Sequence, residues 1–239
     1  MLPPPDVLLE SGAIFLMNKP GGLLTQGPPD IDSLELRTKR WLKVRDEKPG
    51  KVYLGVPHRL DRPVSGVMVL AKNVRAAKRL ADQFRERTAE KKYWAVVEGV
   101  VSDDQGTWAD WMRKVPGEAR SEVVPEDHEG AKRAVLHYRV RGRSEHRTWL
   151  EIELETGRTH QIRLQCGIRQ TPILGDALYS ATTAFGPVTE DQRQRWIALH
   201  ARSLTIEHPI LHRPVSQVAP LSEYWKVFED EFGEMFSEG

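Results

Sequence analysis

Residues 58–72 constrain the fold most, because they join a charged loop directly to an apolar strand. The loop places the carboxylate of Asp61 between the guanidinium groups of Arg59 and Arg62, whose positive charges favour the ionised form of that carboxylate. A proline and a glycine then interrupt regular structure, and residues 67–70 form a short apolar run typical of a buried strand. A charged group on a braced loop is a common active-site arrangement, although an isolated pattern of this kind is more often a surface ion pair.

Short runs rich in apolar, β-branched or aromatic residues predict the strands. We expect them at residues 13–17, 67–70, 93–97, 134–140, 148–154 and 197–206, the last being the final strand. Apolar and polar residues alternate in 134–140 and 148–154, which indicates a half-exposed antiparallel pair.

Residues that favour helix N-termini predict where the helices begin. Asp32 or Ser33 precedes a helix that runs to about residue 44, and Asn73 precedes one that runs to about residue 88. A shorter helix is expected to begin at Thr159 and to hold Arg163 in a fixed orientation.

Length and composition are those of a globular protein. The chain has 239 residues, of which 39% are hydrophobic and 29% charged, and it has a single cysteine, so an intramolecular disulfide is impossible. No apolar run approaches the roughly 20 residues of a membrane helix, and the start lacks the pattern of a secretory signal. We expect a monomeric cytoplasmic protein with no membrane contact.

Charge is distributed unevenly along the chain, although the net charge is only +1. Residues 72–92 contain eight Lys or Arg against three acids, whereas residues 221–239 contain six acids against one lysine. A basic segment next to the Asp61 loop suits a phosphate backbone, and a solvated helix face is the alternative. We expect the acidic tail either to repel a phosphate backbone or to pack its aromatic residues on the core.

We expect one catalytic domain over residues 1–239, with 1–12 as a lead-in and 221–239 as the acidic tail. The polar stretch 100–133 is interpreted as an elaboration between strands of this domain. Its Trp108 and Trp111 either anchor it in the core, which we favour, or stack on RNA bases.

Five stretches resemble, in order, the motifs of the RluA-type pseudouridine synthases. They are residues 18–22, 58–66, 92–95, 157–163 and 199–201 with 208–209. Val64 stands where the family commonly has threonine, which removes a hydroxyl beside the loop and keeps the carboxylate. The resemblance spans nearly the whole chain.

This resemblance implies an α+β fold, with a mixed, largely antiparallel central sheet flanked by helices and loops and a central catalytic cleft. It also implies an RNA pseudouridine synthase that flips a uridine out of its RNA and needs no cofactor or metal. The RNA-binding S4 domain that many members carry before the catalytic domain is expected to be absent. Ribosomal RNA and transfer RNA both remain open as the partner.

Site residues follow from the matched motifs. Asp61 would be the essential carboxylate, as nucleophile or as base, with Arg163 paired to it and Tyr93 over the uracil ring. Arg59 would fill the space that the flipped base leaves. The other expected substrate-binding residues are Lys19, His58, Arg62, Arg158, His160 and Gln161.

Two other functions are weighed against the synthase. A non-catalytic RNA-binding protein on the same fold would also show the basic segment, but it has no chemical reason to keep Asp61, Tyr93 and Arg163 together. A metal-dependent hydrolase is disfavoured because His160 and His200 lack a second ligand at the helical i+4 spacing.

Overall fold

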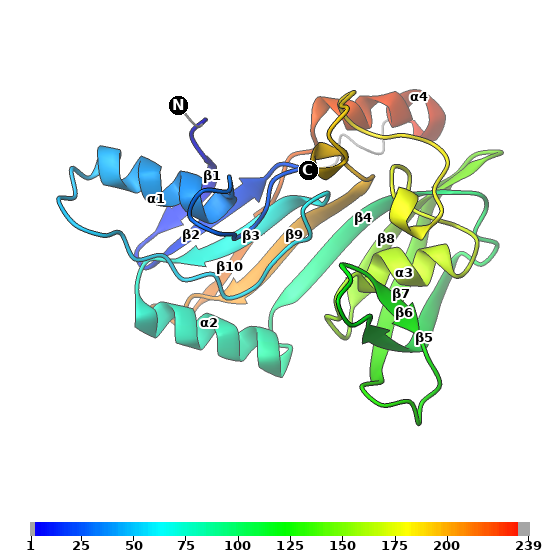
Figure 1. Ribbon diagram of the computed structural model, residues 1–239, viewed down its shortest axis with the longest axis horizontal. Helices are drawn as coiled ribbons and strands as arrows, with labels where there is room; N and C mark the ends of the chain where they lie inside the picture. Colours follow the sequence, from blue (N-terminus) through cyan, green and yellow to red (C-terminus); the bar gives the residue numbers. More distant parts are fainter. Residues whose placement is uncertain (1–2, 234–239) are drawn as a thin grey trace. The chain divides into compact units, whose positions relative to one another are not determined.

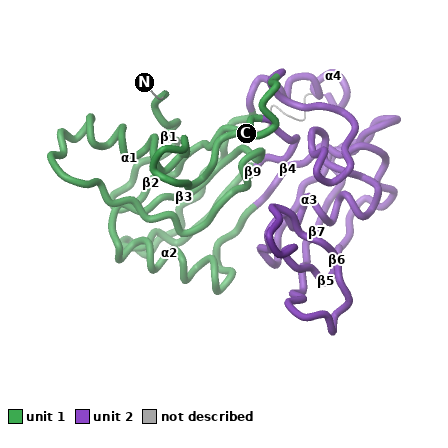
Figure 2. Tube along the Cα trace, viewed as in Figure 1, with its two compact units in different colours: residues 1–91, 189–194, 201–221 green, residues 92–188, 195–200, 222–239 purple. Residues whose placement is uncertain are grey.

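The computed structural model describes residues 3–233 and divides into two compact units (Figure 2). The first unit comprises residues 1–91, 189–194 and 201–221, and the second comprises residues 92–188, 195–200 and 222–239. Each unit consists of three separate ranges of the sequence, so the limits of the units could not be recognised as a single boundary along the chain. The single catalytic domain over 1–239 stays a prediction.

The strands of the first unit follow the spatial order β1-β2-β3-β9, with β10 beside β9 (Figure 1). They are β1 (Asp6–Ser11), β2 (Ile14–Lys19), β3 (Ser65–Ala71), β9 (Leu199–Glu207) and β10 (Pro214–Val218). Neighbours β1–β2, β2–β3 and β9–β10 are antiparallel. The strands expected at 13–17 and 67–70 are confirmed as fully buried β2 and β3 residues.

Two strands of this unit differ from the prediction. Residues 6–11, expected within the lead-in, form β1, which pairs antiparallel with β2. The strand at 197–206 is not the last one, since β10 follows it and begins at Pro214, a position where a strand tolerates proline.

Both helices of the first unit begin where predicted. In α1 (Leu34–Arg45) the hydroxyl of Ser33 accepts the Leu36 N–H at 3.2 Å. In α2 (Val74–Glu86) Oδ1 of Asn73 accepts the Ala76 N–H at 2.8 Å. Buried Ala76 and Leu80 face the core from α2, so its basic side chains remain on the outside.

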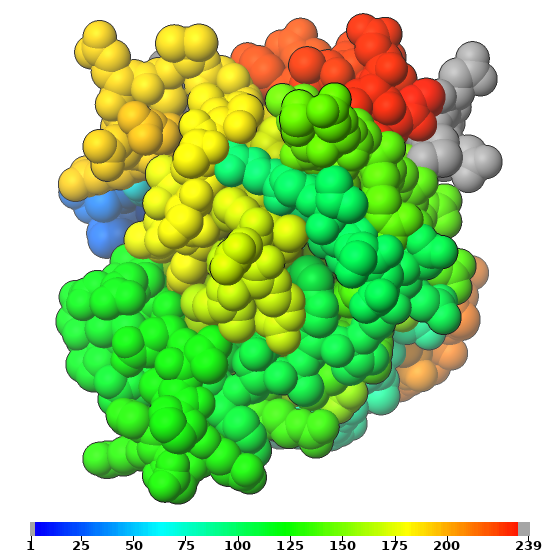
Figure 3. Space-filling model, turned by 90° about the vertical axis from the view of Figure 1, so that its right-hand side faces the viewer, coloured from blue at the N-terminus to red at the C-terminus, as the bar shows by residue number. Residues whose placement is uncertain are grey.

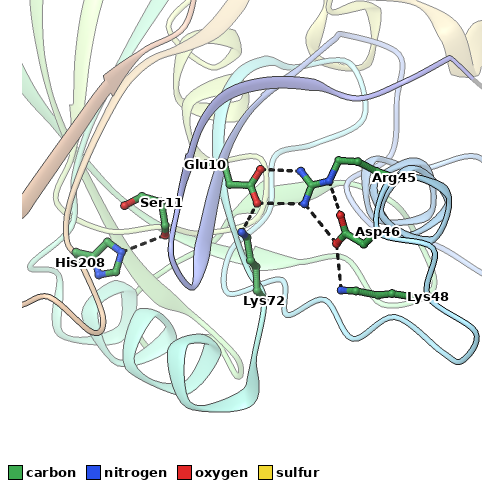
Figure 4. Close-up of polar contacts among 7 residues, drawn as sticks. All are labelled: Glu10, Ser11, Arg45, Asp46, Lys48, Lys72 and His208. Carbon is green, nitrogen blue, oxygen red and sulfur yellow. Dashed lines mark hydrogen bonds and ion pairs between the residues drawn. The ribbon is translucent and has the colours of Figure 1, made fainter.

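An ionic network ties α1 to the edge of the sheet (Figure 4). Glu10 on β1 accepts hydrogen bonds from Lys72 and from Arg45 at the end of α1, the latter at 2.6 Å, and the Arg45 contact lowers the pKa of Glu10. The same guanidinium pairs with Asp46 at 2.6 Å and lies over Trp41 at 4.4 Å. Such a partly exposed network contributes modestly to stability. It connects the end of α1 to β1.

The second unit is a five-stranded antiparallel arrangement in the order β4-β8-β7-β5-β6. Its strands are β4 (Glu90–Glu98), β5 (Gln105–Lys114), β6 (Ser121–Val123), β7 (Lys132–Arg143) and β8 (Arg147–Leu154). The predicted antiparallel pair is confirmed as β7 and β8, and the polar stretch 100–133 contains β5 and β6. The largely antiparallel α+β fold is thereby confirmed.

Helical segments in both units are short apart from α1 and α2. They are α3 (Gln161–Gly167), η1 (Ala177–Tyr179), η2 (Gln192–Gln194), η3 (Glu223–Phe228) and α4 (Glu229–Phe232). Within residues 3–233 no helix combines the length and the hydropathy that crossing a bilayer requires.

The acidic tail packs instead of remaining free to repel RNA. Trp225 and Phe228 are each only 1% exposed, and Phe228 stacks on Phe185 with ring centroids 5.8 Å apart. Arg147 on β8 donates to Glu231 at 2.8 Å, so part of the acidic charge is neutralised locally. Of the two expectations for the tail, packing holds for the described residues. Its acids 234 and 238 lie outside them.

Candidate active site

The backbone around Asp61 is held on both sides. Asp61 is half-buried on the loop before β3. The Thr25 hydroxyl accepts the Leu60 N–H at 3.2 Å and donates to the Leu60 carbonyl at 2.8 Å, while the Val64 N–H closes a turn onto the Asp61 carbonyl at 3.1 Å. The bracing by Thr25 could not be predicted from the sequence, because Thr25 and Leu60 are 35 residues apart.

Gly66 lets this loop approach β9 closely. Its φ is +119°, and a Cβ built there would lie 2.3 Å from the Ala201 carbonyl oxygen. No other residue type fits without moving the backbone. Val64 is buried, so the position that commonly carries a threonine hydroxyl is here filled by apolar atoms.

Lys19 ends β2 with its side chain fully buried. Its Nζ donates to the carbonyls of Pro20 at 2.8 Å, Leu23 at 2.8 Å and Arg62 at 3.2 Å. Burial lowers the pKa of Lys19 to about 7, and the charge of Asp61 opposes this effect. The substrate contact expected of Lys19 stays a prediction. Its donors are used inside the protein, where they tie the Asp61 loop to β2.

His58 anchors the start of the loop. Its Nε2 accepts the Val69 N–H at 3.0 Å, and its ring stacks on Phe84 with centroids 4.2 Å apart. Burial, helped by the charge of Lys91, lowers the pKa of His58 to about 3, so the ring is neutral. These contacts hold the loop in place, and the expected substrate contact of His58 stays a prediction.

Acid is expected to destabilise the protein through His58. Between pH 6.5 and 3 the unfolded chain binds a proton that folded His58 refuses, so stability falls as pH falls through that window. Between pH 7 and 5 the free energy of unfolding should fall by about 2 kcal/mol through this group. Urea unfolding of His58→Gln, which keeps an acceptor for Val69, should lose about 2 kcal/mol less over the same range.

The matched control is His146→Gln, at a side chain that is 81% exposed. Its unfolding free energy should follow the wild-type pH dependence. An unchanged dependence in His58→Gln would mean that His58 is protonated equally in both states.

The two arginines beside Asp61 differ. The Arg59 side chain is exposed, as its expected role in entering RNA requires. Arg62 is half-buried, and its Nε is buried with no hydrogen-bond partner among residues 3–233.

Tyr93 and Arg163 belong to the second unit, and each is described within it. Tyr93 lies in β4 opposite Ile152 of β8 and is mostly buried. Arg163 lies in α3 and is also buried, and its Nε and Nη2 donate to the two carboxylate oxygens of Asp176 at 2.6 and 2.7 Å. Asp176 is not among the site residues that the sequence motifs predicted.

The start of α3 differs from the prediction. The helix is preceded by His160 with φ 55° and no side-chain cap, in place of a Thr159 cap. Nδ1 of His160 lies 2.9 Å from the Tyr179 hydroxyl. Gln161 is buried, and its Oε1 accepts from Thr156 at 2.8 Å and from the Arg158 N–H at 3.0 Å. These bonds give Gln161 a structural role within the unit, and its expected substrate contact stays a prediction.

Arg158 is half-buried, and its Nε donates to the Arg133 carbonyl at 3.0 Å.

Burial raises the pKa of the Cys166 thiol, which stays protonated. No group of three His, Cys, Asp or Glu side chains in the described part of the chain is arranged to hold a metal ion. The absence of a metal requirement stays a prediction.

Comparison with solved structures identifies the fold. The structure of human RNA pseudouridylate synthase domain containing 4 superposes with a TM-score of 0.76 at 24% identity, covering 95% of this chain and 92% of that one. Human RNA pseudouridylate synthase domain containing 1 gives a TM-score of 0.67, also at 24% identity, over 92% of this chain and 86% of that one. The fold is that of the pseudouridine synthases.

Sequence comparison leads from the fold to the family. A family model described as RNA pseudouridylate synthase matches residues 13–167. Ribosomal large subunit pseudouridine synthase D of Xylella fastidiosa is 36% identical over 230 residues, which cover 92% of this chain and 67% of that protein. An uncharacterized RNA pseudouridine synthase of Bacillus subtilis is 34% identical over 221 residues, covering 91% and 69%.

The chain belongs to the RNA pseudouridylate synthase family, and its activity is that of an RNA pseudouridine synthase, an isomerase. The comparisons do not support the non-catalytic alternative.

Proposed function

We propose that this enzyme converts uridine to pseudouridine in large-subunit ribosomal RNA, with Asp61 as its catalytic carboxylate. The observation that carries the choice of RNA is the similarity of over nine-tenths of the chain to synthases named for the large ribosomal subunit. Transfer RNA is the alternative substrate. The location in the cytoplasm and the monomeric state remain predictions from the sequence.

The reaction is an isomerisation whose atoms balance within the substrate. The bond from N1 of uracil to C1′ of ribose breaks, the base rotates, and C5 bonds to C1′. The proton on C5 is then lost and N1 gains one, so neither an oxidant nor a hydrolytic water is consumed. Asp61 acts either as nucleophile or as base, and both routes need an ionised carboxylate on a firmly held loop.

Tyr93 and Arg163 are proposed to act on the same uridine as Asp61, Tyr93 against the uracil ring and Arg163 as the cation that serves the catalytic carboxylate. A stacked nucleotide is out of reach, so the target must be flipped out at a cost of a few kcal/mol, less in a loop than in a duplex. Arg59, exposed and two residues from Asp61, is proposed to occupy the vacated space.

A basic surface on α2 is proposed to bind the RNA backbone. Arg75 and Lys78 are exposed, and neither has an ion-pair partner among residues 3–233. By contrast, Arg79 donates to the Pro209 carbonyl, and Lys92 pairs with Glu153 at 3.2 Å. Of the cations expected to contact RNA, we therefore assign the main role to Arg75 and Lys78, with Lys91 secondary because it is partly buried.

Replacing both side chains, as Arg75→Gln with Lys78→Gln, is expected to weaken the salt dependence of RNA binding. Each phosphate contact to a single strand contributes roughly 0.7 to the slope of log K against log salt, so the slope should flatten by about 1.4. Fluorescence titration of an rRNA fragment at several salt concentrations measures it.

Arg85→Gln is the matched control on the same helix. Arg85 pairs with Asp82 at 2.7 Å and Glu86 at 3.2 Å, so losing it should change the slope much less. An unchanged slope in the double variant would place RNA elsewhere on the protein.

The proposed substrate is tested by tritium release from transcripts that contain 5-tritiated uridine. Large-subunit rRNA should release tritium and transfer RNA should not. Mapping pseudouridine in rRNA from cells with and without the gene should show sites that disappear. Release from transfer RNA alone would overturn the proposed substrate and keep the isomerase.

A further inference from the structure

A buried carboxylate faces Arg163 from the loop after α3. We propose that Asp176 is a positioning residue that holds the Arg163 guanidinium in one orientation for catalysis. The inference rests on the proposed role of Arg163.

The Arg163–Asp176 contact is a two-point ion pair shielded from water. The side chains are 6% and 1% exposed, and Nε and Nη2 of Arg163 each face one carboxylate oxygen. Two parallel hydrogen bonds fix the plane of the guanidinium as well as its distance. Burying two charges costs several kcal/mol per ion, so such a pair is weak evidence of stabilisation, and we interpret it as serving orientation.

The loop that carries Asp176 is itself held rigidly. The Asp176 N–H donates to the Ile173 carbonyl at 2.9 Å, and the Asp176 carbonyl accepts from Tyr179 and Ala181 at 3.0 and 3.1 Å. Gly175 has φ +85°, and a Cβ there would lie 2.4 Å from the Trp196 carbonyl oxygen. Because the backbone is locked on both sides, the carboxylate has little freedom to follow a moving arginine.

Tyr179 restricts the guanidinium from a second direction. Its ring centroid lies 5.3 Å from the Arg163 guanidinium carbon. The Tyr179 hydroxyl accepts the Ser121 N–H at 2.9 Å, which links this loop to β6. Figure 3 shows the β5–β6 segment in green and the segment around residue 175 in yellow, side by side on this face of the second unit.

Asp176→Asn should therefore lower kcat while leaving KM for the RNA nearly unchanged. An amide offers one acceptor oxygen where the carboxylate offers two, so it cannot receive both N–H groups of Arg163. A misplacement of about 1 Å costs on the order of 100-fold in rate, which is the expected loss in kcat. KM should stay within about threefold, because phosphate contacts supply most RNA affinity.

A double-mutant cycle separates positioning from general damage. If Asp176 acts only through Arg163, the double variant Asp176→Asn with Arg163→Lys should be no slower than Arg163→Lys alone. Losses in kcat that multiply would overturn the proposal.

Asp110→Asn is the matched control in the same unit. Asp110 pairs with Arg169 at 3.0 Å and accepts from Gln165 of α3 at 2.7 Å, so its loss disturbs the same helix without touching Arg163. It should lower the melting temperature and leave kcat within about threefold. An equal fall in kcat would mean that any weakening of α3 suffices, which overturns a specific role for Asp176.

A measurement without substrate keeps this inference separate from the choice of RNA. In the wild-type protein the Nε–H of Arg163, bonded to Asp176 at 2.6 Å, should exchange with water slowly in arginine-selective NMR spectra, and at least about tenfold faster in Asp176→Asn. Fast exchange in the wild type overturns the positioning role, even if Asp176→Asn fails to fold. Absence of wild-type tritium release from rRNA would instead contradict the proposed substrate.

Discussion

Asp61→Asn is expected to abolish tritium release from 5-tritiated uridine in RNA. The amide keeps the shape of the carboxylate and loses both its charge and its nucleophilic oxygen, so neither the nucleophile route nor the base route can operate. Binding of the same RNA should survive within about tenfold, or 1.4 kcal/mol, since phosphate and stacking contacts supply most of the affinity. Single-turnover assays with filter binding on the same RNA measure both quantities.

The control for this variant is Asp32→Asn in the same unit. Asp32 pairs with Arg37 at 2.5 Å and is remote in sequence from the loop, so it should keep wild-type turnover. Thermal melting must show Asp61→Asn folded. Tritium release near the wild-type rate would remove Asp61 as the catalytic carboxylate, and so would inactivity that merely follows unfolding.

Ending the chain after residue 221 is expected to prevent the second unit from folding. The truncation removes Trp225 and Phe228, both 1% exposed, and Phe232, which is also buried. Losing one buried Phe or Trp side chain costs about 3–5 kcal/mol, and the sum reaches the whole stability of a typical domain, about 5–15 kcal/mol. Near-ultraviolet circular dichroism and thermal melting should show loss of tertiary packing.

Two smaller changes distinguish packing from tail charge. Phe228→Ala should destabilise by about 3–5 kcal/mol, whereas Val227→Ala, at a side chain 61% exposed, should change stability by less than about 0.5 kcal/mol. A truncation after residue 233 removes two acids and keeps the rings of Trp225, Phe228 and Phe232, so its melting temperature should stay far above that of the truncation after residue 221. A folded protein lacking residues 222–239 that binds RNA more tightly would favour electrostatic repulsion instead.

Local signals in the sequence predicted the starts of α1 and α2 and most of the strands correctly, whereas the start of α3 was wrong. The caps formed by Ser33 and Asn73 could be predicted because each capping oxygen accepts an N–H only three residues further along the chain. Contacts this local can be recognised from the order of the residues alone. The apolar runs of β2 and β3 are buried on both faces, so they stand out without any tertiary information.

Contacts between residues far apart in the sequence could not be predicted from such local signals. From the local sequence Lys19 is expected to be an exposed cation beside a turn, whereas in the structure it is fully buried and one of its bonds goes to the distant Arg62 carbonyl. The tail reads as acidic and solvated, whereas its aromatic residues pack on rings such as Phe185. Asp176 became a candidate only once the fold brought it to Arg163, and the assignment of Tyr93 depends on the family resemblance, since local sequence indicates a packed strand residue.

The strand order β2-β3-β9 makes the timing of synthesis important. β3 ends at Ala71, and the strand that lies along its other edge begins only at Leu199. During translation the Asp61 loop and β3 therefore leave the ribosome long before β9, against which Gly66 packs. Until then an apolar strand edge is open to wrong partners, and pairing over so long a separation is intrinsically slow. The nascent chain is thus most prone to aggregate in the interval between the synthesis of its catalytic loop and that of β9.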